Sequence, residues 1–338
     1  MKTHKSLRGF TVLLAVVGVL SVGIYYLWAG SFFGKKLPEY SIDQFQTFTP
    51  LAQESTQTKP TGLMEALPAT EEAAPAQGVT VGSVCGQRDP MIILALGIDE
   101  NELADVIRLV RVDFVKNKIL ILSIPRAFWV PIPGMNSHRI TQGMLNWTYG
   151  FGEFYNGKGQ GIVEFSRTIY ANYGIRFDRY LVMHINNFVQ VVDAVGGVDI
   201  NLESSIGNYA YYGNLHFDGK QALEFARLRE FDNDHFRIKR QSLILQSLYR
   251  KGLLPENLVK LPVLGARFLT DKSILTDFSL QDVYTFNCLA SELTGDSLIF
   301  KDIPPDLYQG VLKDGRDIII PAPGATTFIQ DMIINGNY

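Results

Sequence analysis

The pattern of hydrophobic and polar residues divides the chain into segments of different character. An uncharged, mostly apolar run extends from Gly9 to Gly34. Residues 35–88 show no sustained periodicity and contain prolines among Thr, Gln and Ala, which is typical of a linker or stalk. Short apolar runs and helical periodicity follow, which predict a folded region to the C-terminus. We divide this region into a domain at 89–255 and an extension at 256–338 that packs on it.

The uncharged run predicts one membrane-spanning helix over residues 9–34. Within it, Phe10 to Trp28 is mostly apolar and long enough to cross a bilayer. Positive residues before the run weakly favour an N-terminus inside the cell, with residues 1–8 as a cytoplasmic tail and the folded region outside. These residues are Lys2, Lys5 and Arg8, against Lys35 and Lys36 after the run. The alternative is a cleaved signal peptide, for which no clear small-residue cleavage site follows.

Apolar runs in the folded region predict its strands. Met91 to Leu96 and Lys118 to Ile124 are apolar almost throughout, which predicts strands covered on both faces. Ile107 to Phe114 alternates with polar residues, which predicts a strand that is half exposed or near a sheet edge. The other predicted elements are strands at Tyr180–Ile185, Val198–Asn201, Phe300–Pro304 and Asp317–Pro321, helices at Gly161–Tyr173, Asn187–Val195 and Ser279–Leu293, and surface loops at Trp147–Gly161 and Ile206–Asn214. This alternation of helices and strands predicts a layered α/β fold.

The stretch Phe225 to Gln241, FARLREFDNDHFRIKRQ, concentrates the candidate chemistry. If its first part is extended, Arg227 and Arg229 share one face. A helix is predicted to follow as far as Gly252, and its spacing places three polar side chains on one face: Arg237, Arg240 and Gln241. Buried arginines are costly without partners, and guanidinium groups match phosphate oxygens in pairs, so a phosphate ligand is one interpretation. The alternative is a solvated helix entry with local Asp–Arg pairs.

Composition narrows the function only slightly. The net charge is −3, with 31 basic and 34 acidic residues, so nothing points to nucleic acid. There is no His/Cys metal spacing and no Gly-x-Ser-x-Gly, which leaves zinc sites and serine-hydrolase chemistry without support. Asp99 and Asp105 at strand ends could hold a divalent cation against phosphate oxygens, although aspartates are also common in turns. Cys85 and Cys288 could form a disulfide outside the membrane, or remain two thiols.

Several motifs occur in a fixed order between residues 89 and 252. They are Met91–Asp99 (MIILALGID), Ser123–Arg126 (SIPR), Val191–Ile200 (VVDAVGGVDI), Phe217–Leu223 (FDGKQAL) and the Arg and Gln pattern of Phe225–Gln241. This ordered set resembles the LytR-CpsA-Psr family of cell-envelope proteins. The resemblance implies an α/β/α sandwich with a mixed central sheet between helix layers.

The resemblance also implies roles for individual residues. Acids matching Asp99 and Asp105 are linked in the family to a magnesium ion (Mg²⁺) and a pyrophosphate. The pyrophosphate would be held by Arg126, Arg227, Arg229, Arg237 and Gln241, with catalysis assigned to Arg126, Arg227, Arg229 and Asp105. We add Arg240 to the phosphate-binding group because it shares a helix face with Arg237 and Gln241.

The implied activity is that of a membrane-anchored phosphotransferase. A glycopolymer on a polyprenyl pyrophosphate lipid would pass, with one phosphate, to a peptidoglycan hydroxyl and release a polyprenyl phosphate. One alternative is a binding protein that holds the lipid or the wall polymer without turnover. Another is a pyrophosphatase that uses water as the acceptor.

The chain departs from the family pattern at three positions. Leu103 stands where many members have Arg, Ala127 where many have Asp, and Thr141 where many have Asn. The chain keeps most residues of the family's pyrophosphate-binding pattern, but it has fewer of the residues that accompany the metal ligands in the family. Reduced activity, or a different acceptor, is therefore an open alternative.

Overall fold

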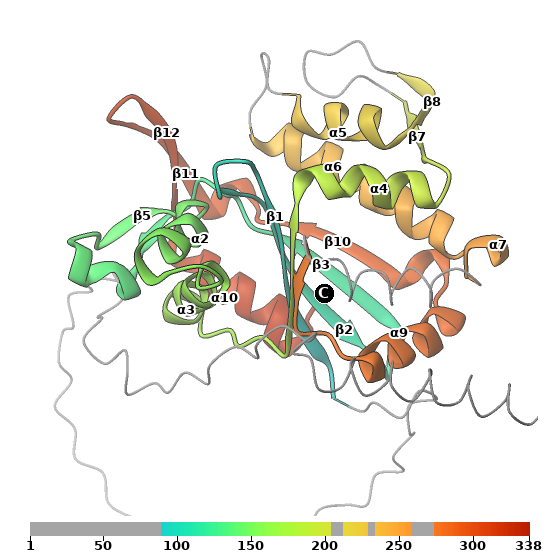
Figure 1. Cartoon of the computed structure of the whole chain (residues 1–338), viewed down its shortest axis with the longest axis horizontal. Helices are drawn as coiled ribbons and strands as arrows, with labels where there is room; N and C mark the ends of the chain where they lie inside the picture. Colours follow the sequence, from blue (N-terminus) through green and yellow to red (C-terminus); the bar gives the residue numbers. More distant parts are fainter. Residues whose placement is uncertain (1–88, 204–211, 229–233, 259–273) are drawn as a thin grey trace, which may run out of the picture.

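A central six-stranded sheet organises the described part of the chain, which comprises residues 89–203, 212–228, 234–258 and 274–338 of this computed structural model (Figure 1). In spatial order its strands are β10 (Leu298–Asp302), β3 (Lys118–Ser123), β2 (Ala104–Asp113), β1 (Met91–Ile98), β6 (Arg179–His184) and β9 (Ile274–Thr276). β2 is antiparallel to both β1 and β3, whereas β6 runs parallel to β1 and β10 runs parallel to β3. The sheet is therefore mixed, as the family resemblance implied.

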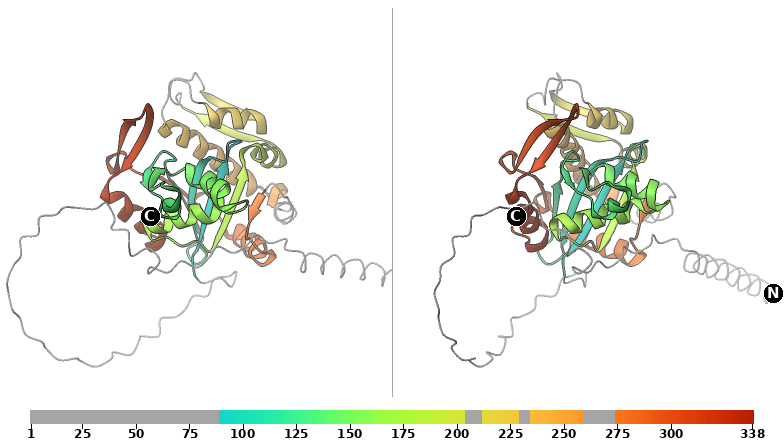
Figure 2. Two further views of the ribbon diagram at one scale, coloured as in Figure 1. Left: turned by 60° about the vertical axis from the view of Figure 1, so that its left-hand side comes forward. Right: turned by 90° about the vertical axis from the view of Figure 1, so that its left-hand side faces the viewer.

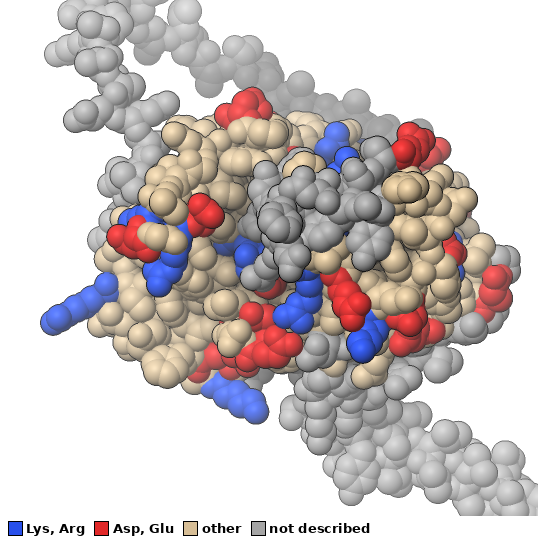
Figure 3. Space-filling model, turned by 90° about the horizontal axis from the view of Figure 1, so that it is seen from above, with Lys and Arg blue, Asp and Glu red and all other residues tan. Residues whose placement is uncertain are grey.

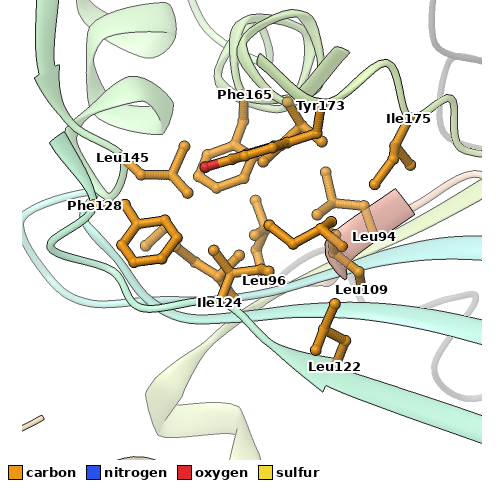
Figure 4. Packing of buried hydrophobic residues seen from close by; sticks show 14 of the residues in the cluster. Leu94, Leu96, Leu109, Leu122, Ile124, Phe128, Leu145, Phe165, Tyr173 and Ile175 are labelled. Atoms are coloured by element: carbon orange, nitrogen blue, oxygen red, sulfur yellow. The ribbon is translucent and has the colours of Figure 1, made fainter. Parts of the chain in front are cut away.

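Three helices contribute to the layer on one face of the sheet: α2 (Trp147–Phe151), α3 (Gly161–Tyr173) and α10 (Pro323–Gln330) (Figure 1). Figure 4 shows Leu94 and Leu109 of the sheet in one apolar cluster with Phe165 of α3. All three side chains are fully buried. Helix α3 has the predicted bounds, because Gly174 takes a left-handed φ of 67° that ends it.

The opposite face of the sheet carries a second layer. Met91 and Ile93 pack there with Leu289 of α9 (Leu280–Glu292). Helix α9 begins where predicted, because Ser279 and Asp282 form a capping box. A further cluster joins α4 (Ile185–Ala194), β7 (Val198–Leu202), β8 (Gly213–Phe217), α5 (Gly219–Arg227) and α6 (Asp234–Gly252). Helices thus cover both faces, which is the layered arrangement that the sequence predicted.

The prediction of an edge strand at Ile107–Phe114 is wrong. These residues belong mostly to β2, which lies between β1 and β3. The polar positions of β2 are buried rather than solvated, because they have partners inside the protein. Arg111 donates from Nη1 to the carbonyl oxygens of Ile333 and Ile334, each at 2.9 Å, and so fastens the C-terminal segment to the sheet.

The prediction of a long loop at Trp147–Gly161 is also wrong in part. The segment contains α2 and a π-helical turn, η3 (Gly152–Asn156), and Tyr149 is buried in the main core. Of the loop predicted at Ile206–Asn214, residues 206–211 lie outside the described residues, and Gly213 and Asn214 begin β8.

Residues beyond 255 contribute β9 and β10, the two edges of the central sheet. A hairpin of β11 (Tyr308–Lys313) and β12 (Arg316–Pro321) projects from the body (Figure 2). The strands predicted at Phe300–Pro304 and Asp317–Pro321 are confirmed, with β10 beginning and ending two residues earlier than predicted. The remaining short elements are β4 (Trp129–Pro131), β5 (Gln142–Met144), η2 (Pro133–His138), α7 (Pro255–Leu258), η4 (Gly295–Ser297), η5 (Pro305–Leu307) and η6 (Asp331–Asn335).

The predicted membrane span at residues 9–34 and the linker at 35–88 lie outside the described residues. Within the described ranges, no helix is long and apolar enough to cross a membrane. Cys288 is disulfide-bonded. The only other cysteine in the sequence, Cys85, lies outside the described residues, so its pairing with Cys288 stays a prediction.

Glu164 in α3 makes the stability of the fold depend on pH. Its side chain is fully buried, and this burial raises its pKa to about 7 despite the opposing charge of Arg167, whose Nη1 lies 3.1 Å from Oε2. The folded state therefore holds this proton more tightly than the unfolded state. Stability is lost as pH rises from the ordinary carboxyl value toward 7, because over this range the unfolded state releases its proton while the folded state keeps it.

We predict that Glu164→Gln stabilises the protein at pH 8 by up to about 3 kcal/mol. The amide stays neutral at every pH, and so the gain should shrink to less than about 1 kcal/mol at pH 5, where the folded wild-type protein already carries the proton. Urea unfolding of both proteins at the two pH values measures the difference. An equal gain at pH 5 and pH 8 would mean that Glu164 does not titrate in this range.

Candidate functional site

Asp99 closes the turn between β1 and β2. Its Oδ1 accepts the backbone N–H groups of Asn101 at 2.9 Å and Leu103 at 2.8 Å. The backbone N–H of Asp99 also donates to the Leu103 carbonyl at 3.0 Å. This short turn sets Asp99 and Asp105 at the same end of two neighbouring strands. Both carboxylates are largely buried, at 8% and 7% exposure.

Arg126 follows β3 and forms an ion pair with Asp105 through Nη1 and Oδ1. The Arg126 side chain is 20% exposed, so the pair lies at the boundary between core and surface. Two residues that the sequence placed in one site are therefore in contact. The structure bears on the departure at Ala127. This side chain is buried, so an aspartate in its place would need a partner of its own.

The prediction that Arg227 lies on a strand is wrong. Arg227 is the last residue of α5, which a capping box between Asp218 and Gln221 starts. Its Nη2 lies 3.4 Å from Oε2 of Glu100 in the turn after β1. The C-terminus of α5 therefore reaches the same end of the sheet as Asp99. Arg229, predicted to share a strand face with Arg227, lies outside the described residues.

Helix α6 brings Arg237 and Gln241 to the same region. Arg237 is 4% exposed, and the Gln241 Oε1 atom accepts a hydrogen bond from Arg108 Nη2 at 3.2 Å. Arg108 lies on β2, three residues after Asp105. The pKa of Arg108 is lowered to about 10, mainly by burial; the charge of Asp302 opposes this change and the charge of Arg237 adds to it. Arg108 and Arg237 are thus neighbouring buried cations.

Sequence reasoning missed Arg108 as a site residue. Its signal was present, because Arg108 interrupts a mostly apolar strand three residues after Asp105. The alternation predicts solvent exposure, whereas in the structure it marks buried cations directed into protein layers on opposite faces of β2. Arg108 and Arg111 differ by an odd number of positions, so their side chains leave the sheet on opposite sides.

The assignment of Arg240 to the phosphate-binding group needs correction. Arg240 is fully buried, and its guanidinium donates to the carbonyl oxygens of Phe225 at 3.0 Å and Leu228 at 2.6 Å. These carbonyls lie at the C-terminus of α5, where carbonyl oxygens have no N–H partner within the helix. Arg240 therefore joins α6 to the C-terminus of α5, which carries Arg227.

A row of buried polar groups continues from Arg108 across the sheet. The strand register places Arg108 beside Ser123 and Ser123 beside Asp302, all on one face. Counting only the described residues, Arg108 Nε, Ser123 Oγ and Asp302 Oδ1 are buried without a hydrogen-bond partner. Buried polar atoms of this kind are costly, and they favour a site that admits water or a polar ligand.

A family model for the LytR_cpsA_psr family matches residues 59–318, which is most of the chain. The chain belongs to the LytR_cpsA_psr family. This confirms the resemblance that the ordered motifs indicated.

Two curated relatives of this chain share one name. The polyisoprenyl-teichoic acid–peptidoglycan teichoic acid transferase TagU of Oceanobacillus iheyensis is 29% identical over 232 residues, covering 63% of this chain and 70% of the relative. The protein of the same name from Bacillus cereus is 30% identical over 247 residues, covering 70% of each chain.

Solved structures agree on the fold. TagV of B. subtilis superposes with a TM-score of 0.60 at 21% identity, covering 74% of this chain and 97% of TagV. TagT bound to LIIa-WTA superposes with a TM-score of 0.59 at 20% identity, covering 73% of this chain and 91% of TagT. At this identity the likeness establishes the LytR_cpsA_psr fold alone.

The predicted metal ligands fit a magnesium ion only as part of a larger set. Within the described ranges, no group of three or more His, Cys, Asp and Glu side chains could hold a metal ion. Mg²⁺ is commonly held by one or two carboxylates together with substrate phosphates and water, so Asp99 and Asp105 suit a metal that binds with a phosphate. Figure 3 views the molecule from above, relative to Figure 1. Basic and acidic side chains lie interspersed on this face.

Proposed function

We propose that this protein is a membrane-anchored phosphotransferase that transfers a glycopolymer of the teichoic acid class from a polyprenyl pyrophosphate lipid to peptidoglycan. The observation that carries the proposal is the gathering of Arg126, Arg227 and Arg237 around one end of β1 and β2. Guanidinium groups suit the oxygens of a pyrophosphate, which carries several negative charges. Relatives named teichoic acid transferases support the choice of polymer and acceptor.

The reaction exchanges one bond to phosphorus for another. The acceptor hydroxyl attacks the phosphorus that carries the polymer, and the bond from this phosphorus to the bridging oxygen breaks. The bridging oxygen leaves with the polyprenyl phosphate, and the polymer stays on the acceptor as a phosphodiester. Arg126 and Arg227 would neutralise charge that develops on the leaving phosphate, and we assign Asp105 to accept the hydroxyl proton.

Asp99 and Asp105 would hold Mg²⁺ next to the pyrophosphate. The ion would supply charge neutralisation on the phosphate oxygens. Oδ1 of Asp99 already accepts two backbone N–H groups, so Asp99 would offer Oδ2, which accepts only a long hydrogen bond, at 3.4 Å, from the Asn101 side chain among the described residues. Leu103 stands where many family members have an arginine, so this end of the site has one cation fewer. Among the described residues, Arg126 is in contact with Asp105.

A labelled lipid substrate tests the proposed function. A polyprenyl pyrophosphate-linked teichoic acid, radiolabelled on the phosphate next to the polymer, is incubated with the protein and peptidoglycan. We expect the label to appear in peptidoglycan. Label that remains on intact lipid bound to the protein would favour a binding protein, and label on free polymer phosphate would favour a pyrophosphatase.

The proposed topology places residues 1–8 in the cytoplasm, residues 9–34 in the membrane and the folded region outside. The uncharged run motivates the anchor, and a disulfide at Cys288 suits an oxidising compartment. A reporter fused after Asp89 should be active only outside the cytoplasm. Cytoplasmic activity at this position would contradict the topology.

A further inference from the structure

The side chains of Arg108 and Gln241 are in contact near the proposed phosphate site. A glutamine amide has an oxygen that accepts hydrogen bonds and an NH₂ group that donates them. Arg108 is donor-only, and its Nη2 lies 3.2 Å from the Gln241 side chain. The atom that faces Arg108 must therefore be the oxygen, Oε1. This fixes the amide orientation by chemistry, because an NH₂ group there would face another donor.

The fixed oxygen leaves the NH₂ group of Gln241 on the side away from Arg108. A donor in this orientation suits a phosphate oxygen, whereas the amide oxygen would repel it. We propose that Arg108 is a positioning residue that turns the Gln241 amide so that its NH₂ group donates to the pyrophosphate. This inference rests on the proposed function, and it gives a role to a residue outside the motifs that indicated the family.

The surroundings of Arg108 support this role. The side chain is 3% exposed on an interior strand, so it has little freedom to turn away from Gln241. Of the charged groups near it, Arg237 on α6 repels the guanidinium and Asp302 on β10 attracts it. Asp302 lies in the same cross-strand row as Arg108, with Ser123 between them, and α6 lies over this face of the sheet. Arg108 is thus placed between the acid on the sheet and the amide on the helix.

Binding of inorganic pyrophosphate, measured by calorimetry on the full-length protein in detergent, tests the inference. Arg108→Met is expected to weaken binding about tenfold, the effect of losing about one charge-assisted hydrogen bond. In a Gln241→Ala background the same substitution should weaken binding by less than about threefold, because Arg108 acts through Gln241. Arg108→Lys should recover part of the loss, since an ammonium group also donates to Oε1.

Arg111→Met is the matched control, because Arg111 is a buried arginine on the same strand whose side chain faces the opposite layer. It should lower the thermal midpoint and leave pyrophosphate affinity within about twofold. Wild-type pyrophosphate affinity in both Arg108 variants would overturn the inference. The proposed phosphate site would then still be tested separately, by the pyrophosphate affinity of Arg227→Ala. Fully additive effects of Arg108→Met and Gln241→Ala would overturn it too, since Arg108 would then act by charge alone. Absence of any pyrophosphate binding by the wild-type protein would overturn both the inference and the proposed site.

Discussion

Arg227→Ala is expected to reduce polymer transfer at least about a hundredfold, the usual effect of losing a positioned group that stabilises transition-state charge. The fold should tolerate the change. Arg227 is 41% exposed on its side chain, and Glu100, 3.4 Å away, is 55% exposed. Exposed pairs of this kind contribute about 0–1 kcal/mol to stability. Transfer of labelled polymer and thermal unfolding, measured on the same preparation, separate the two effects.

Arg250→Ala is the control for Arg227→Ala, because Arg250 is also an exposed arginine near the end of a helix. It should change neither transfer nor stability. Arg227→Lys should recover little activity, since a single ammonium group cannot reproduce the paired donors of a guanidinium. Full transfer by Arg227→Ala would return this arginine to the alternative interpretation, a solvated surface pair.

Arg126 is less suitable for this test than the sequence suggested. The sequence places Arg126 only in the phosphate site, and on this basis its loss would leave stability unchanged. In the structure its guanidinium is the partner of the buried Asp105 carboxylate. Removal of one member of a shielded pair leaves an uncompensated charge, which can cost about 3–5 kcal/mol. Loss of transfer in Arg126→Ala would therefore mix unfolding with lost catalysis.

Local signals account for the parts of the fold that the sequence predicted well. Gly174 ends α3 at the predicted residue because few residues other than glycine adopt its left-handed φ. Ser279 caps α9 through a local capping box. The apolar runs of β1 and β3 indicated interior strands because both faces of these strands are covered. Each signal depends on residues close together in the sequence.

The errors at Arg108 and Arg111 concern side chains whose partners are distant in the sequence. The sequence pattern predicts that Arg111 is exposed to solvent. In the structure it donates to carbonyl oxygens more than two hundred residues away, at Ile333 and Ile334. Arg108 meets Gln241 across 133 positions. Periodicity cannot distinguish an exposed cation from a buried cation with such a partner. The motif order located the Arg126–Asp105 pair because this information came from family resemblance rather than from periodicity.

Arg240→Ala is expected to destabilise the protein by about 3–5 kcal/mol. The side chain is fully buried, so truncation leaves a cavity, and the carbonyl oxygens of Phe225 and Leu228 lose a donor. Because these carbonyls end α5, the helix end that carries Arg227 should also loosen. Chemical unfolding measures the loss directly, and transfer should fall in proportion to the protein that remains folded and correctly docked.

The neighbouring residue supplies the control for Arg240→Ala. Lys239 is exposed on the same helix, so Lys239→Ala should change stability by less than about 0.5 kcal/mol. Sequence spacing placed Arg240 in the phosphate-binding group, whereas its contacts make it a link between α5 and α6. The two roles predict opposite results. Unchanged stability of Arg240→Ala together with lost pyrophosphate binding would restore the phosphate role, because a ligand contact contributes to binding and not to the packing of the unliganded fold.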